Sequence, residues 1–171
     1  TLNSTLFGKI KTIWEKKQTL GLDAEDNKLL EETYKRFIRS GAGLKDQDKE
    51  KLKKINAEMS VLTTQFGQNV LKETNAFELV IDKEADLEGL TSDLKAAAAE
   101  AAKVKGLKDK WVFTLKNPSI MPFLQYAKNR DLRKKIWEAY SLRGNNGNDA
   151  DNKEIVRKIA NLRLEKAKLL G

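Results

Sequence analysis

The side chains that usually carry catalysis are scarce in this chain of 171 residues. It has no histidine and no cysteine, which excludes the commonest general base, the commonest zinc ligands and all thiolate chemistry. Carboxylates occur in pairs at Glu31–Glu32 and Glu84–Asp86, but adjacent helix residues point in different directions. We therefore expect these pairs on solvated surface, and we predict no catalytic, cofactor-binding or metal-binding residue in this chain.

Two loops resemble ligand sites in part. Gly41–Lys45 departs from a phosphate loop, because a predicted helix precedes it and Asp46 stands where serine or threonine is needed. A turn between helices is the favoured interpretation. A calcium loop that starts at Asn146 would need glutamate at its twelfth position, which is Arg157. We expect a polar loop that caps the next helix, formed by Asn146, Asn148, Asp149 and Asp151.

The formal charge of +8 suggests a nucleic-acid partner as one alternative. The densest basic cluster consists of Lys128, Arg130, Arg133, Lys134 and Lys135. We favour a basic outer helix face with Trp137 and Tyr140 turned into the core, and hence no nucleic-acid partner. Binding that falls steeply with salt would support the alternative. A third reading is a helical module that docks a protein. The glycosylation acceptor pattern at Asn3–Thr5 is short and carries little weight.

Three helices that would position these residues are predicted in the first half, where apolar side chains recur at spacings of three and four. The first ends at Gly21, the second runs from Ala24 to the break at 40–43, and the third runs from about Lys45 to about Thr74. The second and third should form an antiparallel hairpin. The expected apolar faces are Leu2, Leu6, Ile10, Ile13 and Trp14; Leu29, Leu30, Tyr34, Phe37 and Ile38; and Leu52, Ile55, Met59, Leu62, Phe66 and Val70.

Two strands are predicted next. Phe77, Leu79 and Ile81 alternate with Glu78, Val80 and Asp82, and Trp111–Leu115 is an apolar, β-branched and aromatic run. The strands could pair in a small sheet that needs packing for stability. Between them, Thr91 or Ser92 should cap an alanine-rich helix that ends at Gly106.

Three more helices complete the pattern. Ser119 and Asn129 are the expected N-caps of the first two, and a loop at 144–149 precedes a last helix from about Asp151 to Leu170. The expected apolar residues are Met121, Phe123, Leu124 and Tyr126; Leu132, Ile136, Trp137 and Tyr140; and Ile155, Val156, Ile159, Leu162 and Leu169. We predict a mainly α fold of helical hairpins with a long central helix and a small two-stranded β ribbon, in one segment without a linker.

An ordered series of segments also resembles one enzyme family. The segments are Tyr34–Leu44, Phe77–Leu79, Asn129–Arg133, Trp137–Tyr140, then Asn152, Ile155, Ile159, Leu162–Arg163 and Ala167–Gly171. From about Tyr34 onward, the chain resembles the peptidyl-dipeptidase and thimet-oligopeptidase family of zinc metallopeptidases, and is nearest to the bacterial peptidyl-dipeptidases. The order of the segments carries the resemblance, since no single motif does.

The resemblance implies a fragment of the N-terminal, non-catalytic half of a larger peptidase, in which a channel admits short peptides. In that family, an H-E-x-x-H helix and a later glutamate bind zinc, and the motif glutamate acts as general base on a zinc-activated water. Zinc would thus belong to the parent protein and not to residues 1–171. The expected partners are short peptides and the catalytic half of the same polypeptide.

Three further expectations follow for the isolated fragment. It should expose apolar surface that could pair two copies in a dimer. No apolar run is long enough for a membrane span. We expect the cytoplasm, with the periplasm as the alternative. The start at Thr1 suggests a piece of a longer polypeptide, with a trimmed chain as the other explanation.

Overall fold

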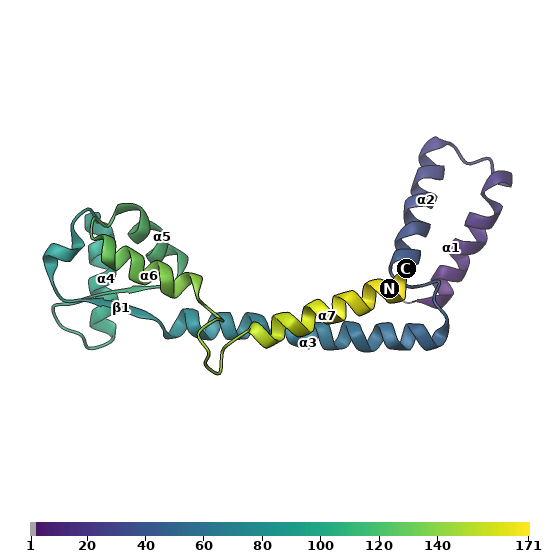
Figure 1. Ribbon diagram of the computed structural model, residues 1–171. Coiled ribbons are helices and arrows are strands. Elements are labelled where there is room, and N and C mark those ends of the chain that lie inside the picture. Colours follow the sequence, from purple (N-terminus) through teal and green to yellow (C-terminus); the bar gives the residue numbers. More distant parts are fainter. Residues whose placement is uncertain (1–2) are drawn as a thin grey trace. The chain divides into compact units, whose positions relative to one another are not determined.

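The computed structural model describes residues 3–171, and the chain forms two compact units (Figure 1). Unit 1 comprises the residues up to Leu62 together with Arg157–Gly171, and unit 2 comprises Thr63–Val156. Two long helices, α3 (Asp46–Ala76) and α7 (Lys153–Leu170), contribute residues to both units. The predicted fold class, mainly α with a long helix and a small β ribbon, is confirmed.

Unit 1 begins with two helices that polar side chains cap at their N-termini. Asn3 Oδ1 accepts a hydrogen bond from Leu6 N at 3.0 Å, and Asp23 Oδ1 accepts one from Asp26 N at 2.8 Å. Gly21, with φ +59°, ends the first helical segment as predicted. The elements are α1 (Ser4–Lys16), the 3-10 helix η1 (Lys17–Thr19) and α2 (Ala24–Arg39). Leu2, expected on the first apolar face, lies outside the described residues.

An aromatic seam joins α1 to α2. The rings of Trp14 and Tyr34 stack with centroids 4.6 Å apart, and Phe7 lies 6.0 Å from both Tyr34 and Phe37. Lys17 Nζ lies 3.8 Å from the centre of the Trp14 ring. The α1–α2 pair is therefore held by half-buried rings, and no residue described in either helix is fully buried.

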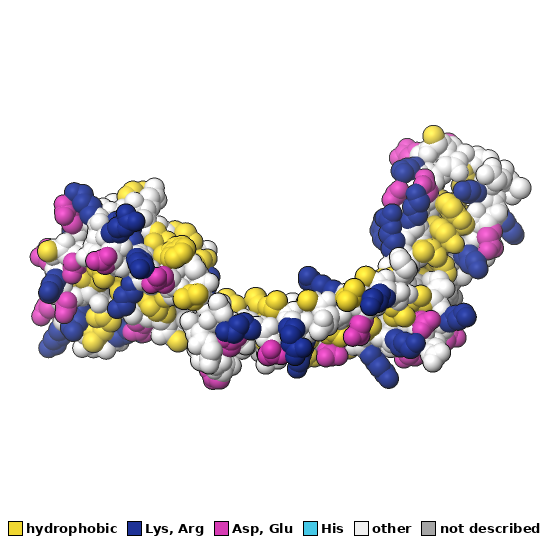
Figure 2. All heavy atoms as spheres, viewed as in Figure 1, with side chains coloured by type: hydrophobic (Ala, Val, Ile, Leu, Met, Phe, Trp, Pro, Cys, Tyr) yellow, Lys and Arg dark blue, Asp and Glu magenta, His cyan; other side chains and the backbone are white. Residues whose placement is uncertain are grey.

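The expected burial of several apolar residues in this pair is wrong. Leu29 is 64% exposed and Ile38 41% exposed, while Leu6 and Ile13 are each 45% exposed. Two packed helices bury only the side chains along the seam between them. The next residue in the sequence lies roughly 100° further around the helix, and its side chain therefore leaves the seam. Figure 2 shows hydrophobic side chains on the visible face of this pair.

The predicted antiparallel hairpin of the second and third helices is also wrong. The turn itself forms as predicted: Gly41 has φ +91°, and Ala42 N donates to Phe37 O at 3.0 Å. However, α2 packs on α1, which takes its aromatic face, and Figure 1 shows α2 turning steeply away from α3. Within unit 1, α3 instead meets α7, where Lys166 Nζ donates to Asn56 Oδ1 at 2.8 Å.

Unit 2 is built around a two-stranded antiparallel sheet. Leu79 pairs with Phe113 and Ile81 with Trp111, so the predicted strands and their pairing are confirmed. Leu79 and Ile81 are buried while Glu78 and Val80 are exposed, as the alternation predicts. The elements are β1 (Glu78–Ile81), the 3-10 helix η2 (Glu84–Leu87), α4 (Ser92–Val104), β2 (Trp111–Thr114), α5 (Asn117–Tyr126) and α6 (Arg130–Ser141).

Two of the three predicted caps in unit 2 are confirmed. Thr91 Oγ1 accepts from Leu94 N at 3.4 Å, and Asn129 Oδ1 accepts from Leu132 N at 3.1 Å. Ser119 is not an N-cap, because α5 already begins at Asn117 and the Ser119 hydroxyl accepts from Thr114 N at 2.9 Å. Pro118 explains the earlier start, since the first helical turn tolerates its missing N–H.

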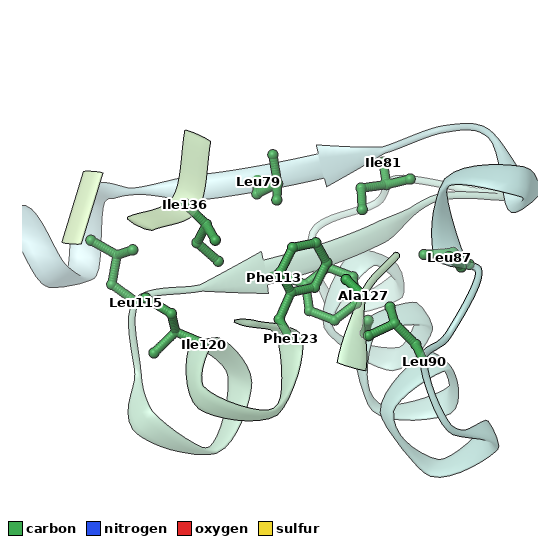
Figure 3. Packing of buried hydrophobic residues seen from close by; sticks show 11 residues of the cluster. Leu79, Ile81, Leu87, Leu90, Phe113, Leu115, Ile120, Phe123, Ala127 and Ile136 are labelled. Atoms are coloured by element: carbon green, nitrogen blue, oxygen red, sulfur yellow. The ribbon is translucent and has the colours of Figure 1, made fainter. Parts of the chain in front are cut away.

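The core of unit 2 gathers side chains from the sheet and the helices around it (Figure 3). Phe113 and Phe123 lie at its centre, with ring centroids 4.6 Å apart and at most 2% exposure. Its members are Leu79, Ile81, Leu87, Leu90, Ala98, Phe113, Leu115, Ile120, Phe123, Ala127 and Ile136. A single contiguous cluster thus holds the ribbon and the helices together, which supplies the packing that two strands need.

Five further helical residues predicted to face a core are instead exposed: Trp137 at 55%, Val156 at 52%, Met121 and Tyr126 at 45% each, and Phe66 at 38%. Ile136 takes the inward position of α6, which turns the following Trp137 outward, whereas Tyr140 packs against the core cluster as expected. Within residues 3–171, no helix combines the length and apolar character that crossing a membrane requires.

Candidate functional site

The densest polar network of unit 2 surrounds Glu73, near the C-terminal end of α3. Its Oε1 accepts hydrogen bonds from the side-chain amides of Asn146 at 2.9 Å and Asn148 at 2.8 Å. Its Oε2 accepts from the backbone N–H of Gly144. We call these four residues the Glu73 clamp. It fastens the loop between α6 and α7 to α3, because one carboxylate serves three donors that are far from it in sequence.

Further contacts hold both sides of this loop. Asn152, only 3% exposed, accepts from Asn69 Nδ2 at 2.9 Å and donates to Phe66 O at 3.2 Å. Arg143 Nη1 donates to Thr74 Oγ1 at 2.8 Å. Asn152 has donor and acceptor both satisfied, as a buried amide requires.

The calcium-like residues of this loop are all used by the protein. The amide nitrogens of Asn146 and Asn148 face Glu73, and Asp149 pairs with Lys72. Asp151 accepts from Gly147 N at 2.7 Å and from Lys153 N at 2.9 Å, close to the start of α7. Among residues 3–171, no three acidic, histidine or cysteine side chains gather closely enough to bind a metal. The contacts agree with a polar loop that leads into and caps the next helix.

The electrostatics of the loop follow from these contacts. Burial raises the pKa of Glu73, but the hydrogen bonds from Asn146, Gly144 and Asn148 outweigh it and hold the pKa below its usual value. The Lys153 ammonium and the N–H groups of Lys153 and Gly147 lower the pKa of Asp151 to about 2. Both carboxylates are therefore ionised in the folded protein at neutral pH.

Acidification should loosen the Glu73 clamp. A carboxylate with a lowered folded pKa contributes stability above its unfolded pKa and loses it as pH falls through the folded value. We expect the free energy of unfolding to fall between about pH 5 and pH 2, and to fall less steeply in Glu73→Gln. Urea denaturation across this range tests it, with Glu50→Gln, an exposed α3 carboxylate, as the control. Equal slopes in Glu73→Gln and the wild type would contradict the expectation.

The paired carboxylates noted in the sequence have structural partners or face solvent. Glu31 pairs with Lys35 and Lys28, and Glu32 Oε1 lies 2.9 Å from Lys28 Nζ; these are partly exposed pairs along one helix. Asp86 accepts from Asn129 Nδ2 at 2.8 Å and so supports an N-cap. Glu84 is exposed.

The basic cluster is partly neutralised by the chain itself. Lys128 Nζ lies 2.7 Å from Glu88 Oε1, and Lys134 Nζ lies 3.7 Å from Glu138 Oε1. Arg133 donates to the carbonyl oxygens of Ala127 and Lys128 and so ties α6 to the segment before it. Three of the five cluster residues therefore have partners within the chain.

An apolar hollow in unit 2 offers space without an acid–base pair. One cavity of about 270 Å³ lies between α4 and β2, and its lining includes Ala97, Ala98, Ala101, Val112, Phe113 and Lys116. An apolar floor with a single exposed lysine can take up an apolar group but has no acid–base pair. Neither the loop nor this cavity assembles the groups that catalysis needs.

Comparison with known proteins gives the family context. The chain is 36% identical over 170 residues to dipeptidyl carboxypeptidase of Escherichia coli (strain K12), an alignment that covers 99% of this chain and 25% of that protein. It is 36% identical over 179 residues to oligopeptidase A of Haemophilus influenzae, covering 98% of this chain and 26% of that protein. It is 37% identical over 172 residues to the probable cytosolic oligopeptidase A of Arabidopsis thaliana, an alignment that covers 97% of this chain and 24% of that protein.

No family model matches the chain. The chain spans about a quarter of the length of these curated relatives, and nearly all of it takes part in each alignment. The predicted resemblance is confirmed: this chain is homologous to one quarter of the dipeptidyl carboxypeptidases and oligopeptidases A.

Proposed function

We propose that this chain acts as a non-catalytic helical part of a zinc-dependent peptidase that cleaves short peptides. The observation that carries the proposal is the 36% identity to dipeptidyl carboxypeptidase over 99% of the chain. The absence of histidine and cysteine agrees with a part that leaves the chemistry to the rest of the enzyme. Among residues 3–171, no group of side chains fits a zinc site, so our proposal assigns the zinc centre to the rest of the parent polypeptide.

The role of the chain in this proposal is to shape the channel that admits peptides. The α1–α2 pair supports the idea of a covering partner, because neither helix has a fully buried residue among those described. Leu6, Ile13 and Leu29 are each at least 45% exposed, and such apolar surface favours a packed interface. The catalytic part of the same polypeptide is the proposed occupant, and a second copy of this chain is the alternative for the isolated piece.

The proposed compartment is the cytoplasm. One relative from Arabidopsis thaliana is named a probable cytosolic oligopeptidase A, which supports this choice. Another relative from the same plant is named organellar.

A chimera tests the proposal directly. The matching quarter of Escherichia coli dipeptidyl carboxypeptidase would be replaced by residues 1–171, and dipeptide release from short peptides would be measured. We expect the chimera to be active, a chelator to abolish its activity, and the chain alone to release nothing even with added zinc. The unmodified Escherichia coli enzyme is the control. A folded, zinc-loaded chimera without activity would defeat the proposal, as would hydrolysis by the isolated chain.

A further inference from the structure

The loop that the Glu73 clamp fastens contains an Asn146–Gly147 pair. Asparagine followed by glycine is prone to deamidation, because glycine has no side chain to hinder attack by its own backbone nitrogen. Both residues are exposed, and Gly147 has φ +67° with open space around its Cα. We propose that Asn146 is a site of spontaneous deamidation, that the Glu73 clamp suppresses the reaction, and that the product weakens the clamp.

The reaction needs only water. The Gly147 nitrogen attacks Asn146 Cγ, a new C–N bond forms, the bond from Cγ to Nδ2 breaks, and ammonia leaves with the proton from the attacking nitrogen. Water then opens the five-membered imide to give aspartate or isoaspartate at position 146. No group is oxidised or reduced, and the chain gains one carboxylate.

In the folded chain, the Asn146 side chain and the Gly147 nitrogen are both held in hydrogen bonds to carboxylates. Asn146 Nδ2 donates to Glu73 Oε1 at 2.9 Å, which holds the side chain on α3. Gly147 N donates to Asp151 Oδ2 at 2.7 Å, so the nucleophile also has a partner. Each hydrogen bond to a carboxylate must break before attack can occur. Deamidation therefore requires local opening of the loop, and its rate reports how often the clamp opens.

The product would turn the attractive contact between residues 146 and 73 into a repulsive one. A carboxylate at position 146 cannot donate to Glu73, and the two anions would face each other at a distance where like charges repel. Gly144 and Asn148 would remain on Glu73, so the clamp is weakened at one of its three donors. The modification thus acts in one direction, towards a loop that is held less firmly on α3.

Neighbouring asparagines supply internal comparisons. Asn145, Asn148 and Asn152 are each followed by a residue with a side chain, which hinders attack. Asn145 Oδ1 accepts from Lys153 Nζ at 3.1 Å, so a carboxylate there would gain an opposite charge. Asn145→Asp is therefore a matched control for Asn146→Asp, with the same charge change one residue away.

The first experiment measures deamidation by peptide mapping with mass spectrometry after incubation at mildly alkaline pH. We expect slow deamidation in the wild type, confined to Asn146, and an increase of about tenfold in Glu73→Ala and in Asp151→Asn. Glu50→Ala, an exposed carboxylate on the same helix, should match the wild type. Wild-type rates in both loop variants would overturn the proposal, as would deamidation that favours another asparagine.

The second experiment measures hydrogen exchange of the amides in residues 142–152. Asn146→Asp should speed exchange by about tenfold while Asn145→Asp leaves it unchanged. Unchanged protection in Asn146→Asp would overturn the claim that the product weakens the clamp. Circular dichroism checks that each variant is folded. If Glu73→Ala does not fold, the deamidation rate of Asp151→Asn still tests the proposal.

Discussion

Replacing Phe123 by alanine is expected to lower the free energy of unfolding of unit 2 by about 3–5 kcal/mol. Phe123 is completely buried, and its ring lies 4.6 Å from that of Phe113 at the centre of the core cluster. The substitution removes the ring and leaves a cavity that its neighbours fill only in part. The loss also includes the pairing of the two rings, which adds to the burial term.

Phe66→Ala is the matched control, because it makes the same chemical change at a side chain that is 38% exposed. Urea denaturation followed by far-ultraviolet circular dichroism gives both free energies. The control should lose much less than the core variant. Similar losses in the two variants would mean that Phe123 is not at the centre of a tightly packed core.

Gly89→Ala should be the second large effect, with a loss of roughly 2–4 kcal/mol. Gly89 has φ +90°, a conformation that costs a side chain energy, and an added Cβ would overlap the carbonyl oxygen of Tyr126. The same Cβ would lie 3.2 Å from Lys128 N, which donates to Glu88 O at 2.8 Å. Backbone atoms on the facing segment cannot move away as a flexible side chain could.

Gly106→Ala separates the two causes of this loss. Gly106 has φ +72°, but no atom lies within 4 Å of the position that its Cβ would take. The control should therefore lose only about 1 kcal/mol, from the backbone conformation alone. Thermal unfolding of both variants measures the difference. If Gly106→Ala is as destabilising as Gly89→Ala, the close approach between the two segments contributes nothing.

Local signals in the sequence predicted much of the fold. Asn129 and Thr91 are confirmed caps, because a side chain of the right type precedes an apolar helical pattern. The strand alternation was equally clear, since Leu79 and Ile81 share the buried face of β1. These features depend on residues close in sequence, so no knowledge of the tertiary contacts was needed.

Features that depend on distant residues were missed. Leu29 and Trp137 have the right spacing for burial, yet in the residues described no element covers their side of the helix. The Glu73 clamp joins α3 to a loop more than 70 residues later. One signal in the sequence pointed to it. Asn69 lies three residues after Phe66, and Glu73 lies four residues after Asn69, so two polar side chains share a helix face with an apolar one.

The two-unit arrangement has a consequence for synthesis on the ribosome. Unit 2 is one uninterrupted stretch, Thr63–Val156, whereas unit 1 combines residues before it with Arg157–Gly171. During translation, unit 2 has all its residues before the last helix of unit 1 has emerged, so it can fold first. The α1–α2 pair is made earliest but waits longest for its partners. For that period its aromatic seam holds it together, and its exposed apolar side chains stay open to solvent on the nascent chain.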